Sequence, residues 1–346
     1  MYETTDASAL TGAAPPRGVR VDRDDNDNGN DNAFRRDLLA GLSKTPRSIA
    51  PKYFYDAEGS ALFDRICELP EYYPTRTERH ILERHGREMA EVVGPHADII
   101  EFGAGSLEKI RILLHSFGAR ALPRRYFPID ISAAHLEAAA SRLHADYPWL
   151  QVRPIAADYM KEAQLSGLDA STGRRVGFFP GSTIGNFDAD EAMAFLQLAA
   201  RVLEGGGLLV GVDLVKDPQT LHRAYNDAQG VTAAFNMNLL RRANAELSAD
   251  FDLREFGHYA FYDPRKCRIE MHLVSRCAQT VHVAGRDFSF DEGESLHTEN
   301  SHKFTIEGFR KLAVSAGFRP GPVWTDDAQL FSVHWLESPE GGMGAS

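Results

Sequence analysis

Residues 99–109 read IIEFGAGSLEK and combine a short apolar run, a glycine turn and the start of a polar segment. The apolar run is typical of a buried strand. Apolar residues then recur at Ile110, Leu113, Leu114 and Phe117, the spacing of one helical face. A strand, a glycine turn and a helix in this order begin a parallel β-α-β unit. This segment therefore predicts an α/β fold with a ligand near the turn.

The alternation of strands and helices continues on both sides of this segment. We expect strands at Tyr126–Asp130, Val152–Ala157, Val176–Phe179, Leu208–Val215, Pro322–Trp324 and Phe331–Leu336, and helices at Leu136–Leu143, Glu191–Leu203 and from Thr305 to Ala316. Thr75 and Glu78 have the spacing of a capping box and predict a helix from about Arg76 to Val93. The pattern predicts a doubly wound, mostly parallel, Rossmann-like sheet.

The alternation stops after Lys216. A helical segment, Leu239 to Leu247, is followed by strand-like segments at Arg268–Ser275 and Thr280–Phe290. We therefore predict an inserted α+β domain made of residues 33–75 and 217–303, and a sheet domain made of residues 76–216 and 304–338. Residues 1–32 have few apolar groups to bury and are predicted to be a disordered tail.

Composition excludes several classes of function. The chain has 346 residues, with 38 basic and 49 acidic side chains, so its formal charge is −11. An acidic chain of this kind is a poor candidate for binding nucleic acid or an anionic membrane. The three cysteines form no CxxC and the histidines form no HExxH, so we expect no metal site. No apolar run is long enough for a membrane span, and the N-terminus lacks the pattern of a signal peptide. We expect a cytoplasmic protein that works as a monomer on a small molecule.

The glycine turn defines the expected cofactor site. Gly103 and Gly105 allow close backbone approach, but Glu108 stands where a dinucleotide fingerprint needs its third glycine. Asp130 ends the next strand, where a carboxylate can accept hydrogen bonds from ribose hydroxyls. Asp158, with Tyr159 beside it, ends the strand after that and could accept from an adenine amine.

Lys109 is the most informative residue of this group. With Ser106 as the expected N-cap, Lys109 lies in the first turn of a helix, where a cation opposes the helix dipole. Such a charge is useful there if it holds an anion. A ligand with a carboxylate, a ribose and an adenine but no pyrophosphate fits all these features. S-adenosylmethionine is such a ligand, and the alternative is a glycine turn with solvated charges.

Seven segments in order resemble one enzyme family. They are PKYFYDAEGSALFD (51–64), LPEYYPTRTE (69–78), EFGAGSLEK (101–109), FPGSTIGNF (179–187), GVDLVKD (211–217), RAYND with GVTAAFN (223–236) and HTENSHKF (297–304). They resemble the histidine Nα-methyltransferases of ergothioneine biosynthesis, class I enzymes that use S-adenosylmethionine to convert L-histidine to hercynine. The resemblance implies a Rossmann-like methyltransferase domain with a separate substrate domain.

The resemblance also implies roles for single residues. Its cofactor positions correspond to Gly103, Lys109, Asp130, Asp158 and Tyr159, and its histidine-binding positions to Tyr72, Asn186, Tyr225, Glu299, Asn300 and Ser301. Met271 matches a pocket wall, Tyr55 and Phe63 match aromatic positions near the amine, and the catalytic group would be Asn186, Tyr72 and Tyr55. Family members often have a β-branched apolar residue in place of Asn300, so only its backbone is expected to face substrate.

These residue types suit histidine. An asparagine amide both donates and accepts, so Asn186 can hold a carboxylate and an amine together. If residues 297–301 are extended, His297, Glu299 and Ser301 share one face, and Glu299 can accept an imidazole N–H while Ser301 serves the other nitrogen. Three alternatives stay open: a related methyltransferase acting on another amino acid such as tryptophan, an NAD-dependent oxidoreductase, and a non-catalytic cofactor sensor.

Overall fold

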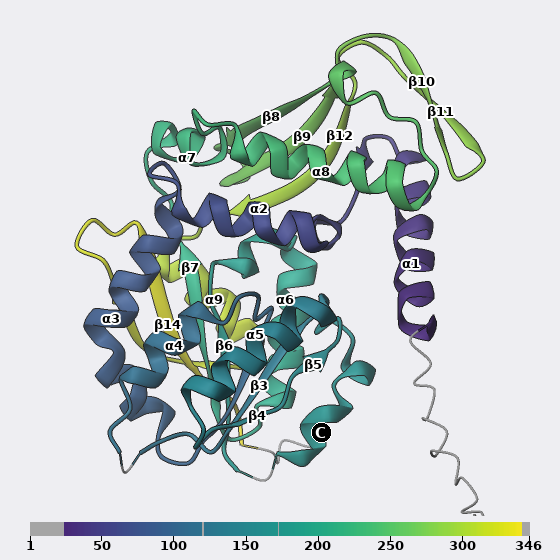
Figure 1. Ribbon diagram of the computed structural model, residues 1–346. Helices are drawn as coiled ribbons and strands as arrows, with labels where there is room; N and C mark the ends of the chain where they lie inside the picture. Colours follow the sequence, from purple (N-terminus) through teal and green to yellow (C-terminus); the bar gives the residue numbers. More distant parts are fainter. Residues whose placement is uncertain (1–23, 120, 172, 341–346) are drawn as a thin grey trace, which may run out of the picture.

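An eight-stranded sheet forms the centre of the larger of two packed bodies in the computed structural model, which describes residues 24–119, 121–171 and 173–340 (Figure 1). Its strands are β2 (Asp98–Phe102), β3 (Arg125–Asp130), β4 (Gln151–Val152), β5 (Ile155–Ala156), β6 (Arg175–Phe179), β7 (Gly207–Asp213), β13 (Arg319–Thr325) and β14 (Phe331–Glu337). They lie in the order β13-β14-β7-β6-β2-β3-β4, with β5 also paired to β3. The neighbouring strands β7, β6, β2, β3 and β4 are parallel to one another. Strand β14 is antiparallel to both of its neighbours, β13 and β7.

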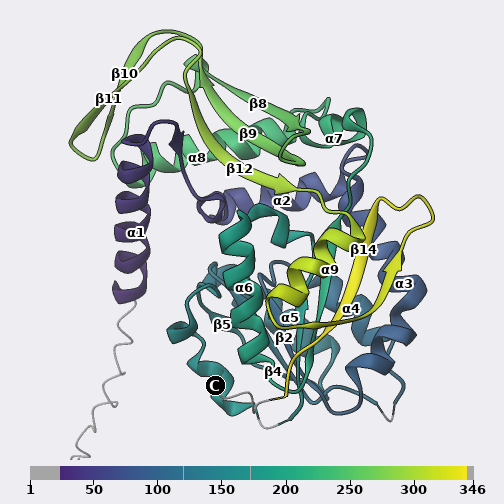
Figure 2. The same cartoon turned by 180° about the vertical axis from the view of Figure 1, so that it is seen from behind.

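Helices cover both faces of this sheet (Figures 1 and 2). One face packs against α3 (Tyr73–Val93), α4 (Glu108–His115) and α5 (Ala133–Asp146), and the other against α6 (Ala189–Val202) and α9 (Ile306–Ser315). Each face has its own buried apolar cluster. This arrangement confirms the predicted doubly wound, Rossmann-like α/β fold.

The smaller body is built on a second sheet in the order β1-β12-β9-β8. Its elements are α1 (Asp24–Leu42), β1 (Arg47–Ser48), α2 (Ala57–Glu68), α7 (Pro218–Tyr225), α8 (Val231–Glu246), β8 (Phe256–Asp263), β9 (Arg268–Ser275), β10 (Gln279–Val283), β11 (Arg286–Phe290) and β12 (Ser295–His302). One apolar cluster joins residues between 34 and 73 to residues between 221 and 296. This shared core supports the division into two domains at the predicted boundaries, which stays a proposal.

Short 3-10 helices connect several of these elements. They are η1 (Pro51–Phe54), η2 (Glu162–Gln164), η3 (Ser166–Ala170), η4 (Thr183–Asn186) and η5 (Leu253–Glu255). In the described part of the chain, no helix combines the length and the apolar character that crossing a membrane requires.

Four local predictions are wrong. The predicted strand Val152–Ala157 is two short strands, because Pro154 lacks the N–H that a continuous ladder needs. The predicted strand Thr280–Phe290 is the hairpin β10–β11, which turns at Ala284 and Gly285, both with positive φ. Helix α1 begins at Asp24, so the run 24–32 is not the disordered tail that we predicted, and residues 1–23 lie outside the described residues.

The fourth error concerns helix starts. Helix α3 begins at Tyr73, with Pro74 in its first turn and no side-chain cap, so Thr75 and Glu78 form no capping box. Helix α4 is preceded by Leu107 in a left-handed conformation (φ 62°), and Ser106 does not cap it. Neither helix therefore begins with a side-chain cap.

Candidate active site

The carboxyl ends of β2 and β3 bring the predicted cofactor residues together. Gly103 follows β2 with φ 68°, and a Cβ atom there would lie 3.4 Å from the ring of Tyr159. The carboxylate of Asp130 accepts hydrogen bonds from the backbone N–H groups of Gly105 and Ser132, both at 3.0 Å. These bonds fix a partly exposed carboxylate beside the glycine turn, the position from which it can accept from a ribose.

Asp158 and Tyr159 lie next to this turn. One carboxylate oxygen of Asp158 accepts from the Met160 backbone at 3.1 Å, and the other pairs at 3.2 Å with Lys52 of the smaller body. The Tyr159 ring packs edge-on against Phe102 and Phe179. Asp158 therefore lies where the two bodies meet, and Tyr159 packs in an aromatic cluster beside it.

Lys109 lies in the first turn of α4, as expected, but its nearest anion belongs to the protein. Its Nζ is 2.7 Å from a carboxylate oxygen of Glu78 on α3. Burial alone would lower the pKa of Lys109, and Glu78 outweighs this and raises it. Both oxygens of Glu78 also accept from the Gly181 backbone at 2.9 Å. The Lys109–Glu78 pair thus joins the cofactor turn to the loop before η4.

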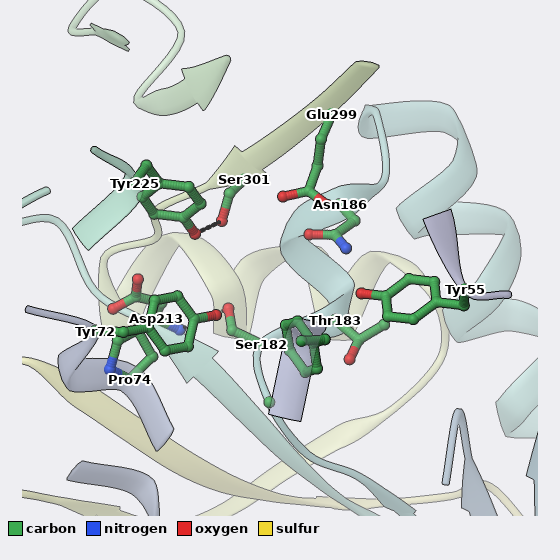
Figure 3. A pocket seen from close by; sticks show the side chains of 12 residues that line it. Tyr55, Tyr72, Pro74, Ser182, Thr183, Asn186, Asp213, Tyr225, Glu299 and Ser301 are labelled. Carbon is green, nitrogen blue, oxygen red and sulfur yellow. Dashed lines mark hydrogen bonds between the residues drawn. The ribbon is translucent and has the colours of Figure 1, made fainter. Parts of the chain in front are cut away.

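A cavity lies between the two bodies, beside this pair (Figure 3). The space between its lining residues, open mouth included, is about 410 Å³. The residues that line it are Tyr55, Phe63, Tyr72, Pro74, Gly181, Ser182, Thr183, Asn186, Asp213, Tyr225, Glu299 and Ser301. Most of the predicted substrate residues are in this set. Some precede and others follow Lys216, where the strand-helix alternation stops.

A β-bulge in β12 decides which side chains reach the cavity. Opposite β9, His297 pairs with His272 and Glu299 pairs with Met271, so Thr298 is an extra residue between them. The extra residue moves His297 to the opposite face of the sheet, and the expectation that it shares a face with Glu299 is wrong. Glu299 and Ser301 keep the face toward the cavity (Figure 3).

Met271 and Asn300 are predicted substrate residues that do not line the cavity. Met271 is buried in the core of the smaller body, directly opposite Glu299 on the neighbouring strand β9. The Asn300 side chain points to the other face of the sheet, where its Oδ1 is 3.0 Å from Nε2 of His297. The Asn300 arrangement agrees with the expectation that only its backbone faces the substrate.

Asn186 reaches the cavity because η4 packs closely on β12. A Cβ atom on Gly185 would lie 2.8 Å from the carbonyl oxygen of His302, so only glycine permits this approach. Ser182 precedes η4 and accepts a hydrogen bond from the Asp213 backbone at 2.9 Å, which ties the loop to the end of β7. Asn186 is thereby held opposite Glu299 (Figure 3).

An aromatic wall closes another side of the cavity. Rings of Tyr55, Phe63, Tyr72 and Tyr225 meet edge to face, with centroids 5.7 to 6.4 Å apart. Burial raises the pKa of Tyr55 and Tyr72 well above the usual phenol value. The charges of Glu299 and Asp130 add to the upward shift of the Tyr55 pKa.

Buried charges lie in the wall of the cavity and next to it. Asp213, at the end of β7, pairs with Lys303 at 2.8 Å and with Lys216, and it accepts from the Tyr73 hydroxyl. Burial alone would raise the pKa of Asp213, but the two lysines hold it below its usual value. Glu299 is buried, and burial raises its pKa to about 8 although the charge of Lys303 opposes the shift.

Sequence reasoning missed Asp213, Lys303 and Glu78. Asp213 and Lys303 lay inside two of the quoted family segments, but no local pattern marks either as functional. Their partners are remote in sequence: Tyr73 is 140 residues before Asp213, and Tyr225 is 78 residues before Lys303. Glu78 was assigned to a helix cap. Only the assembled fold brings these groups together.

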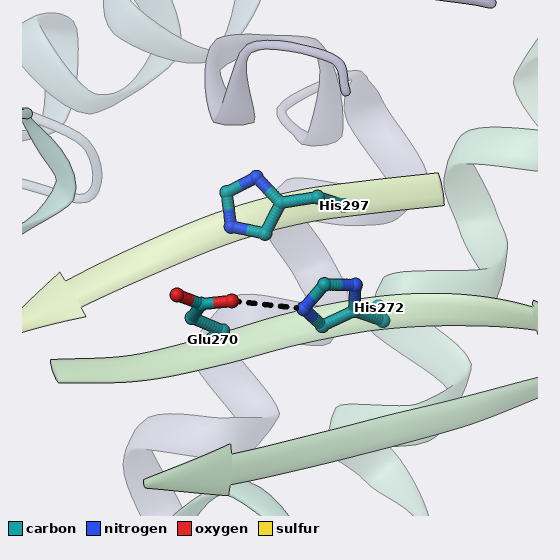
Figure 4. Close-up of side chains that lie close together, drawn as sticks. All are labelled: Glu270, His272 and His297. Carbon is teal, nitrogen blue, oxygen red and sulfur yellow. Dashed lines mark hydrogen bonds and ion pairs between the residues drawn. The ribbon is translucent and has the colours of Figure 1, made fainter. Parts of the chain in front are cut away.

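A second polar cluster lies on the far face of the smaller sheet. Glu270, His272 and His297 offer ligand atoms within 4.8 Å of one another (Figure 4). Arg268 and Lys266, however, already bind Glu270, through the oxygen that faces away from His272. Two cations on one carboxylate disfavour a divalent ion, so we interpret the cluster as a network of ion pairs and hydrogen bonds.

Comparisons with known proteins agree with this geometry. Residues 34–338 match the family described as "Histidine-specific methyltransferase, SAM-dependent". The chain is 44% identical to a histidine N-alpha-methyltransferase of Mycolicibacterium smegmatis over 304 residues, 87% of this chain and 94% of the relative. For the same enzyme of Mycobacterium tuberculosis the identity is 42% over 305 residues, with the same coverage of 87% and 94%.

A fungal protein matches over a smaller share of its length. The chain is 29% identical over 296 residues to ergothioneine biosynthesis protein 1 of Neurospora crassa, which covers 81% of this chain and 32% of the relative. The family match extends over both bodies of the structure, and the bacterial relatives align almost from end to end. This chain belongs to the family of histidine-specific methyltransferases that use S-adenosylmethionine.

Proposed function

We propose that this protein transfers methyl groups from S-adenosylmethionine to the α-amine of L-histidine, up to the trimethylated betaine hercynine. The observation that carries the proposal is the pair Glu299 and Ser301, buried side by side on the cavity face of β12 and opposite Asn186. A carboxylate and a hydroxyl at this spacing can serve the two nitrogens of an imidazole.

The cofactor residues fit S-adenosylmethionine. Asp130 would accept from the ribose hydroxyls, Asp158 from the adenine amine, and Lys109 would bind the carboxylate, while Gly103 leaves space for the ligand beside Tyr159. The cofactor supplies a methyl group bound to a sulfonium sulfur, which is an electrophilic carbon. Asp158 would exchange its ion pair with Lys52 for the adenine, and Lys109 can hold a second anion besides Glu78.

The substrate residues would fix the amino acid from both ends. Glu299 and Ser301 hold the imidazole, and Asn186 donates from its amide NH2 to the carboxylate and accepts an amine N–H with its amide oxygen. Tyr72, which lies beside Tyr225 in the wall, adds a hydroxyl donor. The amine then points toward Tyr55, between the substrate cavity and the cofactor turn. In-line positioning of this kind is the main source of rate for a displacement at carbon.

Three successive transfers require a site that tolerates a growing cation. The rings of Tyr55, Phe63 and Tyr72 offer negative π faces to a quaternary ammonium without needing an N–H to donate. The two tyrosines keep their protons because burial raises their pKa values, so they are poor bases. We therefore expect the amine to lose each proton to solvent. A cytoplasmic location, a monomeric state and a place in ergothioneine biosynthesis are further parts of the proposal.

Release of S-adenosylhomocysteine tests the proposal. The protein is incubated with S-adenosylmethionine and one amino acid at a time, including histidine, its Nα-methyl and Nα,Nα-dimethyl forms, and tryptophan. We expect release with histidine and with both methylated forms, at rates at least as high for the latter, and little with tryptophan. Binding of cofactor without release for any amino acid would indicate a sensor and overturn the proposal. Preference for tryptophan would indicate the related substrate class.

A further inference from the structure

Lys303 follows β12 and has no exposed side-chain surface. An ammonium group has three N–H donors. Those of Lys303 have three acceptors: Asp213 Oδ2 at 2.8 Å, Ser301 Oγ at 2.7 Å and Tyr225 Oη at 3.2 Å. Asp213 raises the pKa of this lysine despite its burial, so it stays charged. Lys303 is therefore a fixed donor to the hydroxyl that faces the cavity.

Ser301 receives a second hydrogen bond from the same side. The Tyr225 hydroxyl donates to its Oγ at 2.7 Å, as the dashed line in Figure 3 shows. Because the Tyr225 oxygen already accepts from Lys303, its proton is directed to Ser301. A serine hydroxyl has two lone pairs and one proton. Both lone pairs of Ser301 are occupied, and only its proton remains for a ligand in the cavity.

From this geometry we propose that Lys303 is a positioning residue that makes Ser301 an obligatory donor, so that the site binds neutral imidazole and rejects imidazolium. The inference rests on the proposed function. A neutral imidazole presents one N–H, which Glu299 accepts, and one lone pair, which accepts the Ser301 proton. An imidazolium presents two N–H groups and needs an acceptor at each nitrogen. Ser301 cannot be the second acceptor.

Other titrating groups act on every ligand alike. The charged and titratable side chains around Ser301 and Glu299 are Tyr55, Tyr72, Tyr225, Asp213, Lys216 and Lys303. Burial raises the pKa of Glu299 to about 8, and burial lowers that of Lys216 to about 8. These titrations change the affinity for any amino acid whose ring donates an N–H to Glu299. A comparison of two ligands that differ only in the ring removes their contribution.

The test compares histidine with 1,2,4-triazol-3-ylalanine, whose ring stays neutral where imidazole titrates. Dissociation constants are measured by calorimetry on the full chain with S-adenosylhomocysteine bound, from about pH 8 to about pH 5, across the imidazole pKa of about 6.5. The affinity for histidine relative to triazolylalanine should fall about tenfold per pH unit below that pKa. Parallel profiles for the two ligands would overturn the inference.

Two matched variants assign the effect to Lys303. Lys303→Met frees a lone pair of Ser301, so the relative loss of histidine affinity at low pH should shrink. Lys216→Met also removes one cation from Asp213 but has no contact with Ser301, so it should keep the wild-type ratio. Tyr225→Phe frees the other lone pair in an isosteric side chain and replaces Lys303→Met if that variant does not fold.

The outcomes separate this inference from the proposed function. Lack of methyl transfer to histidine at about pH 8, where imidazole is neutral, would overturn both. Methyl transfer with parallel pH profiles would leave the proposed function intact and remove the role of Lys303. An unchanged ratio in a folded Lys303→Met variant would likewise remove it.

Discussion

Glu299 is the residue on which the choice of substrate is expected to depend. Glu299→Ala should lower kcat/KM for histidine by roughly ten- to a hundredfold, the value of a charge-assisted hydrogen bond of about 1.5–3 kcal/mol. Cofactor affinity should stay the same. In the wild type, an indole leaves the buried carboxylate of Glu299 without a partner, and the variant removes this penalty. The histidine-to-tryptophan ratio of kcat/KM should therefore also fall.

Asn300 provides the control on the same strand. Its side chain lies on the other face of the sheet, so Asn300→Ala should leave histidine kcat/KM within about twofold of wild type, a surface-substitution effect. An unchanged histidine-to-tryptophan ratio in Glu299→Ala would contradict the role given to Glu299.

Lys109 pairs with Glu78, and we expect it to bind the cofactor in addition. Lys109→Ala should weaken S-adenosylmethionine binding by roughly ten- to a hundredfold through loss of a charge-assisted hydrogen bond. Glu78→Gln loses the same ion pair but keeps the lysine, so it should lower the melting temperature with a smaller effect on affinity. Calorimetry and thermal melting on both variants separate the two roles. Equal affinity in wild type and Lys109→Ala would mean that the lysine serves only Glu78.

At the scale of elements, Gly185 controls the distance between η4 and β12. Gly185→Ala would place a methyl group about 0.5 Å too close to the His302 carbonyl and push Asn186 out of register. We expect a stability loss of about 1–3 kcal/mol and a larger fractional loss in kcat/KM for histidine than in cofactor affinity. Gly118→Ala is the control, because a Cβ atom there has no neighbour within 4 Å. Equal losses in the two variants would contradict the proposed packing role.

Sequence patterns predicted where helices and strands lie better than they predicted which face of a sheet a side chain points to. Strand-helix alternation predicted the succession of strands and helices along the chain, because apolar periodicity is local, but it gave no strand order within the sheet. The bulge at Thr298 was invisible, since one extra residue reverses a period-two pattern without changing composition. Helix caps were also misassigned, because the side chain of Glu78 found a partner 103 residues away instead of the local backbone.

At the scale of the whole molecule, acid should destabilise the fold through His334. This histidine lies in β14, between β13 and β7 of the large sheet, with 1% of its surface exposed, and burial lowers its pKa to about 3. Below the unfolded pKa of about 6.5, the unfolded chain binds a proton that the folded chain cannot. Stability should therefore fall as the pH drops from about 6.5 toward 3, by about 1.4 kcal/mol per pH unit at most.

Replacement of this side chain tests the acid effect. His334→Leu should flatten the pH dependence of the unfolding free energy between about pH 6.5 and pH 5, the range in which only the unfolded histidine titrates. His282→Leu is the control, because that histidine is half exposed and paired with Asp287. A wild-type acid slope in folded His334→Leu would assign the effect to other groups, such as His302.

The two-body organisation was predictable, and the charges between the bodies were not. The change of pattern at Lys216 and the return at Thr305 mark where the chain leaves and re-enters the sheet. The cavity forms only when both bodies meet, and the ion pairs of Asp213 and Asp158 cross that junction. Pairings between distant segments leave no local signal, so resemblance to a family carried the prediction of the site.

The proposed function depends on which nitrogen of histidine receives the methyl groups. Tandem mass spectrometry of histidine incubated with the protein and excess S-adenosylmethionine answers this. We expect a final product that carries three additional methyl groups. On fragmentation, all three should be lost together with the α-nitrogen as trimethylamine. Methylation of a ring nitrogen, or a single-methyl product that accumulates without further turnover, would contradict it.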